Sequence, residues 1–248
     1  FSRHSAWRAL AMADVKDRYY RSKVGIVWAP LSIAIFVGVL SPIYAELFAV
    51  EVRVYALHLL LGLIVWNFLF ASIIDSGREF AASRDLMVTY GLGYSLLVMR
   101  TVWRNFIVLA FQFIAFVAFS VILANWPSFV WLSSLFALFV VLMFSFGVSF
   151  LMAIAASRFR DTVEIINNLF RLLFFATPIM WMPALRSEFD WVLQINPFYY
   201  LIELVRSPLV NQEINRTAWM VSIACVFLVN IAALGCFARY RKKIAFWL

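Results

Sequence analysis

The feature that most constrains the fold is a run of 53 residues without a charge, at positions 105–157. A membrane-spanning helix needs about 20 apolar residues, so this run is too long for a single crossing. An Asn-Trp-Pro-Ser sequence at 125–128 is typical of a turn and divides the run into two spans, 105–124 and 129–157. Because 65% of the chain is hydrophobic and only 14% is charged, we predict an all-α integral membrane protein.

Further apolar runs predict four more spans and therefore six transmembrane helices in all. The additional spans are expected at 29–48, 54–74, 165–185 and 217–238. Pro178 lacks an N–H and should kink the span in which it lies, the fifth. The apolar stretch 191–202 is too short to cross a bilayer and is interrupted by Asn196 and Pro197. We expect this stretch to be a re-entrant or interfacial segment.

The N-terminal part of the chain, residues 1–28, is amphipathic. Within it, residues 5–21 place apolar side chains at helical spacing, while the basic side chains fall elsewhere on the wheel. We expect a helix that lies in the cytoplasmic membrane interface.

The basic residues predict the orientation of the chain in the membrane. With six spans both termini lie on the same side, and that side would hold 17 of the 21 lysines and arginines. Cytoplasmic loops are enriched in these residues, so we expect both termini in the cytoplasm. This asymmetry and anionic lipid explain the net charge of +8, and no nucleic-acid partner is expected.

The sequence lacks the common signatures of enzymes and of ion-driven carriers. It contains no G-x-x-x-x-G-K-[ST] loop, and His4 and His58 have no second ligand at metal-binding spacing. The third, fourth and sixth spans carry no ionisable residue, whereas proton- and sodium-driven carriers use such groups within the membrane. We therefore expect no catalytic set, metal or cofactor in this chain. Either the energy comes from elsewhere or transport is passive, and a membrane subunit that uses a separate ATPase fits this pattern.

Six short motifs occur in order along these predicted spans. The first is a D-V-K-x-R-Y stretch from Asp14 that continues through S-x-V-G-x-x-W to Trp28. The others are Leu60-Leu61-Gly62-Leu63 with Trp66, Met99-Arg100-Thr101-Val102-Trp103-Arg104-Asn105, Arg160-Asp161, Thr177-Pro178-Ile179-Met180-Trp181, and Asn196-Pro197 with Arg206. In this order and topology the chain resembles the permeases of ABC-2 type polysaccharide exporters, and those of O-antigen exporters in particular.

The resemblance implies that residues 1–248 form a single ABC-2 type transmembrane domain. Such a permease is a homodimer and docks two ATP-binding cassette subunits, which bind ATP and Mg²⁺. Its cargo would be a lipid-linked polysaccharide of the O-antigen type, exported across the bacterial inner membrane. A capsular polysaccharide, a teichoic acid, a drug or a lipid are alternative cargoes. From other classes, a passive channel and a membrane-embedded transferase acting on lipid-linked sugars through Asp161 and Glu164 also remain open.

Aromatic rings are candidates for the glycan path, because pyranose rings rest well on aromatic faces. By analogy with the family, the first and fifth spans would line this path between two protomers. The candidates are Phe36, Tyr44 and Phe48 in the first span and Phe170, Phe174, Pro178 and Trp181 on one face of the fifth. The alternative is that these rings face lipid or pack between helices.

Charged residues near the predicted membrane surfaces suggest three further roles. A cytoplasmic mouth that contacts the phosphates of the lipid carrier would use Arg18, Arg21, Lys23 and Arg171. The loop after the second span mixes charges with apolar anchors, which suits contact with the ATPase through Arg78, Glu79, Arg84 and Asp85. An outer vestibule would contain Arg186, Glu188, Asp190, Asn196 and Arg206. The alternatives are a solvated loop at the coupling segment and ordinary loop polarity at the vestibule.

Overall fold

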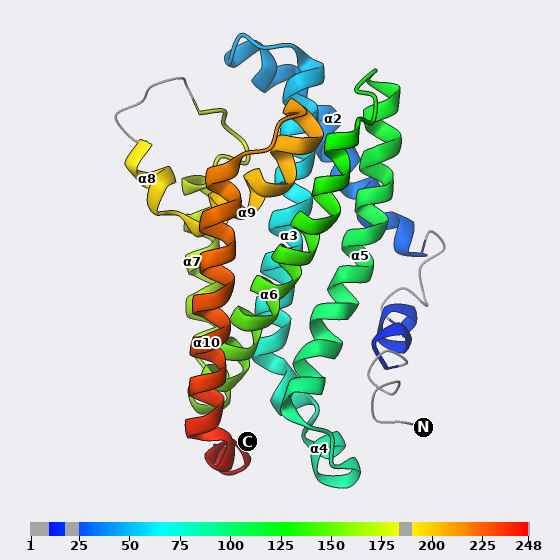
Figure 1. Cartoon of the computed structure of the whole chain (residues 1–248). Coiled ribbons are helices and arrows are strands. Elements are labelled where there is room, and N and C mark those ends of the chain that lie inside the picture. The colour runs from blue at the N-terminus through cyan, green and yellow to red at the C-terminus, as the bar shows by residue number, and fades with distance from the viewer. Residues whose placement is uncertain (1–9, 18–24, 184–189, 248) are drawn as a thin grey trace.

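The computed structural model describes residues 10–17, 25–183 and 190–247, and all regular structure within these ranges is helical (Figure 1). Residues 10–17 form a helical segment, and a 3₁₀ turn at Gly25–Val27 precedes the first long helix. The remaining elements are α2 (Trp28–Leu47), α3 (Val52–Ala82), α4 (Arg84–Tyr90), α5 (Tyr94–Ile122), η2 (Phe129–Trp131), α6 (Leu132–Arg158), α7 (Thr162–Ala176), α8 (Asp190–Ile195), α9 (Pro197–Arg206), the π-helical turn η3 (Ser207–Asn211) and α10 (Arg216–Trp247).

Helix α3 is the centre of the bundle. It packs against α2, α5, α6, α7 and α9, and all of residues 55–66 are buried. This part of α3 is apolar around its whole circumference, which is typical of a helix that other helices surround.

The outer helices α2 and α10 bury only narrow stripes. In α2 the buried residues are Ile33, Val37, Ser41 and Ala45, four positions apart, whereas Ile35 and most other bulky side chains are exposed. In α10 the few buried residues include Ala218 and Ala233, and large apolar side chains on its other faces are exposed. Apolar faces this extensive are expected where a helix meets lipid or another membrane protein.

Within the residues that the structure describes, five helical segments are long and apolar enough to span a membrane. They are Gly25–Leu47, Val52–Ala82, Tyr94–Ile122, Phe129–Arg158 and Arg216–Trp247. Each contains or overlaps one of the predicted spans, which confirms a multi-pass helical protein. Figure 1 places α4 and the C-terminal end of α10 at one end of the bundle, and α8 and α9 toward the other.

The predicted fifth span, 165–185, is not one continuous helix. Helix α7 ends at Ala176, and Thr177 is extended with φ −98° and ψ 135°. Residues 177–183 are not helical, so Pro178 follows a helix end instead of kinking a span. A 15-residue helix is about 22 Å long and does not cross about 30 Å of hydrocarbon on its own.

The N-terminal segment is helical over residues 10–17, within the predicted amphipathic range. Ala11 and Val15 are buried against the bundle, while Met12 is exposed. The helical periodicity is therefore seen in these eight residues, and their position in a membrane interface stays a prediction.

Candidate functional site

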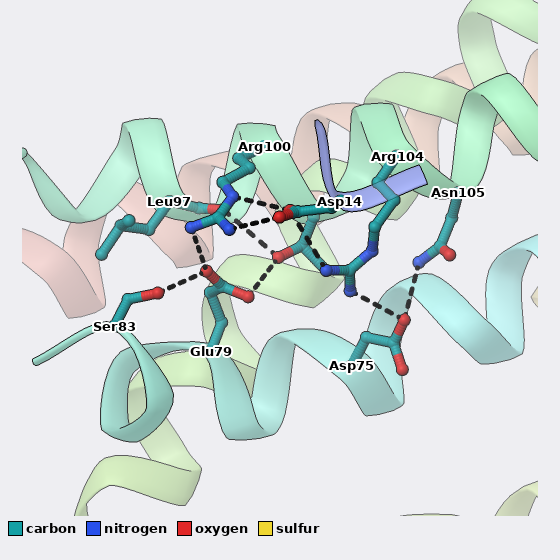
Figure 2. A network of polar contacts seen from close by, with 9 residues as sticks. Asp14, Asp75, Glu79, Ser83, Leu97, Arg100, Arg104 and Asn105 are labelled. Carbon is teal, nitrogen blue, oxygen red and sulfur yellow. Dashed lines mark hydrogen bonds and ion pairs between the residues drawn. The ribbon is translucent and has the colours of Figure 1, made fainter. Parts of the chain in front are cut away.

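A cluster of charged side chains joins the N-terminal helical segment to α3 and α5 (Figure 2). Arg100 donates two hydrogen bonds to Asp14, from Nε to Oδ2 at 2.7 Å and from Nη2 to Oδ1 at 2.6 Å. Both side chains are more than four-fifths buried, at 14% and 17% exposure. A paired, fork-shaped contact between arginine and carboxylate fixes orientation as well as distance.

Two acids of α3 extend this cluster. Asp75 accepts from Arg104 Nη2 at 2.9 Å and from Asn105 Nδ2 at 3.3 Å. Glu79 accepts hydrogen bonds from two hydroxyls, those of Ser83 at 2.8 Å and Thr101 at 2.9 Å, and lies 3.6 Å from Arg100 Nη1. We call Asp14, Asp75, Glu79, Arg100 and Arg104 the ionic cluster.

The spacing of these residues explains why they meet. Asp75 and Glu79 are four residues apart on α3, and Arg100 and Arg104 are four apart on α5, so each pair lies on one helix face. Asp14 lies between the two guanidinium groups in Figure 2, 3.5 Å from Arg104 Nη1. The first and third sequence motifs are therefore in direct contact. Two acids four residues apart on one helix and two arginines four apart on another could have suggested the pairing of α3 with α5.

The residues predicted to couple to an ATPase occupy two different environments. Arg78, Arg84 and Asp85 are exposed at the end of α3 and in α4, where a docking protein could reach them. Arg78 also lies 3.4 Å from Glu164, one of the two acids considered for a transferase. Glu79 is buried within the ionic cluster, so in this structure it can act on a partner only through the residues around it.

Residues 177–183, which we call the unwound segment, leave backbone carbonyls without helical partners. Side chains of α3 and α9 satisfy three of these carbonyls, as non-helical backbone at membrane depth requires. The pairs are Arg206 Nη2 with the Pro178 oxygen at 3.0 Å, the Tyr55 hydroxyl with the Met180 oxygen, and His58 Nε2 with the Trp181 oxygen at 3.3 Å.

Helix α9 is anchored to the start of the unwound segment. The Asn196 side chain accepts from the Phe198 N–H at 3.0 Å and so caps α9. Its Nδ2 also donates to the Thr177 hydroxyl at 2.8 Å. Asn196 is buried, so it holds two segments together instead of facing an open vestibule.

Arg206 is a buried charge that sequence reasoning placed in the outer vestibule. Its side chain is only 2% exposed and pairs with Glu203 at 2.8 Å. The guanidinium approaches α3 at Gly62, where an added Cβ would lie 2.6 Å from Arg206 Nη2. The glycine of the second sequence motif is therefore required for the arginine of the sixth to reach Pro178.

The predicted path residues of α2 differ in exposure. Phe36 is exposed at 44% on the outer face of the helix. Tyr44 and Phe48 are half-buried and pack on Tyr55 of α3, with ring centroids 5.9 and 6.0 Å apart. These rings lie next to the side chain that holds the unwound segment.

The predicted path residues of α7 border a groove. Phe170 is buried against Trp66 of α3, with centroids 5.3 Å apart, and Phe174 lies 5.8 Å from the same ring. Trp181 donates its indole N–H to the Phe175 carbonyl at 3.0 Å, which folds the unwound segment back over the end of α7.

This groove between α3 and α7 has a volume of ≈ 430 Å³ and an aromatic wall. Two polar side chains border it, Asn67 and Arg171. Asn67 is exposed near the middle of a helix whose neighbouring residues are buried, and Arg171 is exposed as well. Sequence reasoning missed Asn67, although a lone amide in an apolar span was visible.

Other predicted residues lie outside the described ranges. These are Arg18, Arg21 and Lys23 at the cytoplasmic mouth and Arg186 and Glu188 of the vestibule. Asp190 begins α8.

A search of family models matches residues 5–210 to the ABC-2 type transporter model. The match spans the ionic cluster, the groove and the unwound segment. The chain belongs to the ABC-2 type transporter family. It is therefore a transporter permease, and the family places such chains with ABC ATP-binding subunits.

Curated relatives match nearly the whole length of the chain. The O-antigen export system permease protein RfbA of Klebsiella pneumoniae is 23% identical over 94% of this chain and 90% of the relative. The protein of the same name from Myxococcus xanthus is 22% identical over 96% of this chain and 93% of the relative.

Proposed function

We propose that the chain is the membrane subunit of an ATP-driven exporter of a lipid-linked polysaccharide of the O-antigen type. The observation that carries this proposal is end-to-end similarity to O-antigen export permeases, within a family that the chain belongs to. A partner subunit hydrolyses ATP, and this chain supplies the route through the bacterial inner membrane. Both termini face the cytoplasm.

The aromatic groove between α3 and α7 supports a sugar cargo. Its rings offer flat apolar faces, and Asn67 and Arg171 offer hydrogen bonds along the same wall. The groove is open on one side. Helices α2 and α7 both have exposed apolar faces. A second copy packed on these faces would close the path, so the working unit is a homodimer.

The ionic cluster supports coupling to a motor on the same end as α4. Arg78, Arg84 and Asp85 form the exposed contact surface, while Glu79 carries a displacement of α3 to Arg100 and onward to Asp14. Movement of the docking surface therefore reaches the N-terminal segment through side chains that are already in contact.

The direct test is reconstitution of the permease with its ATP-binding subunit in proteoliposomes. Lipid-linked O-antigen is supplied on the side of that subunit, and cargo on the opposite side is measured with a lectin. The proposal expects transfer only with ATP. Permease alone, and a complex whose P-loop lysine is replaced, should give none.

Two results would contradict the proposal. Transfer by the permease alone indicates a passive channel, and modification of the lipid-linked sugar by the isolated chain indicates a transferase. Transfer of a capsular polysaccharide or teichoic acid, but not of O-antigen, keeps the exporter and changes its cargo.

A further inference from the structure

A second groove lies between the ends of α6 and α10, away from the groove of the proposed path. It has a volume of ≈ 310 Å³. Leu151, Ile154 and Cys236 provide an apolar wall, and Arg158 stands at the last residue of α6. Neither the ionic cluster nor the unwound segment contributes to it.

Aromatic rings surround the charged end of this groove. The guanidinium carbon of Arg158 lies 5.1 Å from the centroid of Phe159 and 5.3 Å from that of Trp247. Tyr240 packs on Trp247 at 5.6 Å and completes the rim. Tryptophan and tyrosine gather where a bilayer meets water, so the rim marks the headgroup level of a membrane.

The charge at this end is unbalanced. Within the described part of the chain no ion pair joins Arg158 to an acid, and the last turns of α10 contain no acid at all. Those turns add four exposed cations, Arg239, Arg241, Lys242 and Lys243. The site therefore favours an anion.

The shape of the groove selects an amphiphile. From Leu151 to Arg158 the wall extends seven residues along α6, about 10 Å, which accommodates part of an acyl chain. A free phosphate would meet the arginine but would leave this apolar wall uncovered. A phospholipid covers both parts at once.

The wall begins where α6 and α10 are in closest contact. An added Cβ at Gly147 would lie 2.8 Å from Val229, and Asn230 Nδ2 donates across to the Met143 carbonyl at 3.2 Å. The apolar wall of the groove thus starts one turn beyond a close contact between the two helices.

We propose that the groove between α6 and α10 binds one anionic phospholipid of the surrounding bilayer. The headgroup phosphate accepts hydrogen bonds from Arg158 beside Trp247, and one acyl chain lies along Leu151 and Ile154. This inference goes beyond polysaccharide export and does not depend on it.

Trp247 provides the reporter for the test. The chain is reconstituted in phosphatidylcholine vesicles that contain a rising fraction of phosphatidylglycerol brominated in its acyl chains, or of brominated phosphatidylcholine. The Trp247 signal is the fluorescence difference between the unmodified chain and Trp247→Phe. We expect brominated phosphatidylglycerol to quench this signal at an about fivefold lower fraction than brominated phosphatidylcholine, a preference that comes from the direct contact between the anionic headgroup and Arg158.

Matched variants separate a site from general charge attraction. Arg158→Gln should remove the fivefold preference, Arg158→Lys should retain it, and Lys242→Gln should leave it unchanged, because Lys242 is exposed outside the groove. Equal loss in Arg158→Gln and Lys242→Gln, or equal quenching by both lipids, overturns the proposal. Displacement of the brominated lipid by equimolar polyprenyl diphosphate also overturns it, since the site would then belong to a lipid carrier.

Discussion

Arg100 on α5 donates two parallel hydrogen bonds to Asp14, although the residues are 86 positions apart in sequence. The contact holds the helical segment 10–17 against the bundle at the end where α3 meets α4. The segment is therefore held by a largely buried charged pair as well as by the buried side chains of Ala11 and Val15.

We expect Asp14→Asn to uncouple transport from ATP hydrolysis. The change removes the negative charge that faces Arg100 and Arg104. It therefore weakens the hydrogen bonds from Arg100, and hydrogen bonds to charged groups contribute about 1.5–3 kcal/mol each. ATP-dependent export should fall severalfold, while ATP hydrolysis by the reconstituted complex continues. Asp17→Asn removes an exposed acid of the same segment and should export normally. Equal effects of the two variants would exclude a specific role for the pair.

Arg206→Ala should destabilise the chain by about 3–5 kcal/mol, because it leaves the largely buried Glu203 without its partner and the Pro178 carbonyl without a donor. Thermal unfolding in detergent measures this loss. Arg216→Gln, at an exposed position, should have little effect. An unchanged transition in Arg206→Ala would mean that the unwound segment does not depend on this arginine.

Gly62→Ala and Gly38→Ala should have opposite outcomes. A Cβ at position 62 would lie 2.6 Å from Arg206 Nη2 and 3.2 Å from Ile179 Cγ2, whereas nothing lies within 4 Å of one at position 38. Overpacking typically costs about 1–3 kcal/mol, while alanine in an exposed helix gains up to about 1 kcal/mol over glycine. Thermal unfolding of both variants measures the difference. A stable Gly62→Ala protein would show that Arg206 has room to move.

Arg171→Gln and Asn67→Leu should lower export without lowering stability, because both side chains are exposed at the aromatic groove and support no other element. Initial export rates and unfolding temperatures are measured together. Asn168→Ala, exposed on α7 outside the groove wall, is the control. Normal export in both groove variants would remove these residues from the path.

The long helices could be predicted from sequence because their signal is local. An uncharged run of sufficient length has few alternatives to a membrane span, and five such segments appear in the structure. The run 165–185 is also apolar but carries Arg171 and Pro178, and its outcome differs. Its helix ends at Ala176 because Tyr55, His58 and Arg206 offer side-chain partners to the carbonyls that follow. Nothing in the run itself encodes those distant partners.

The sequence motifs that contribute to the candidate site could be recognised, but the contacts between their side chains could not be predicted. The stretches around Asp14 and Arg100 stood out as sequence patterns, yet their pairing depends on how α3 and α5 pack. Glu79 illustrates the limit, since an acid in a mixed-charge loop suggests an exposed docking residue. Its burial follows from two hydroxyls, on Ser83 and Thr101, that only the folded chain brings to it.

The unwound segment has a consequence for biosynthesis. Pro178 is synthesised 28 residues before Arg206, whose side chain donates a hydrogen bond to the Pro178 carbonyl. Tyr55 and His58 have already been synthesised at that point, whereas α9 has not. The unwound segment can therefore complete its hydrogen bonds only after α9 has been synthesised and has packed on α3.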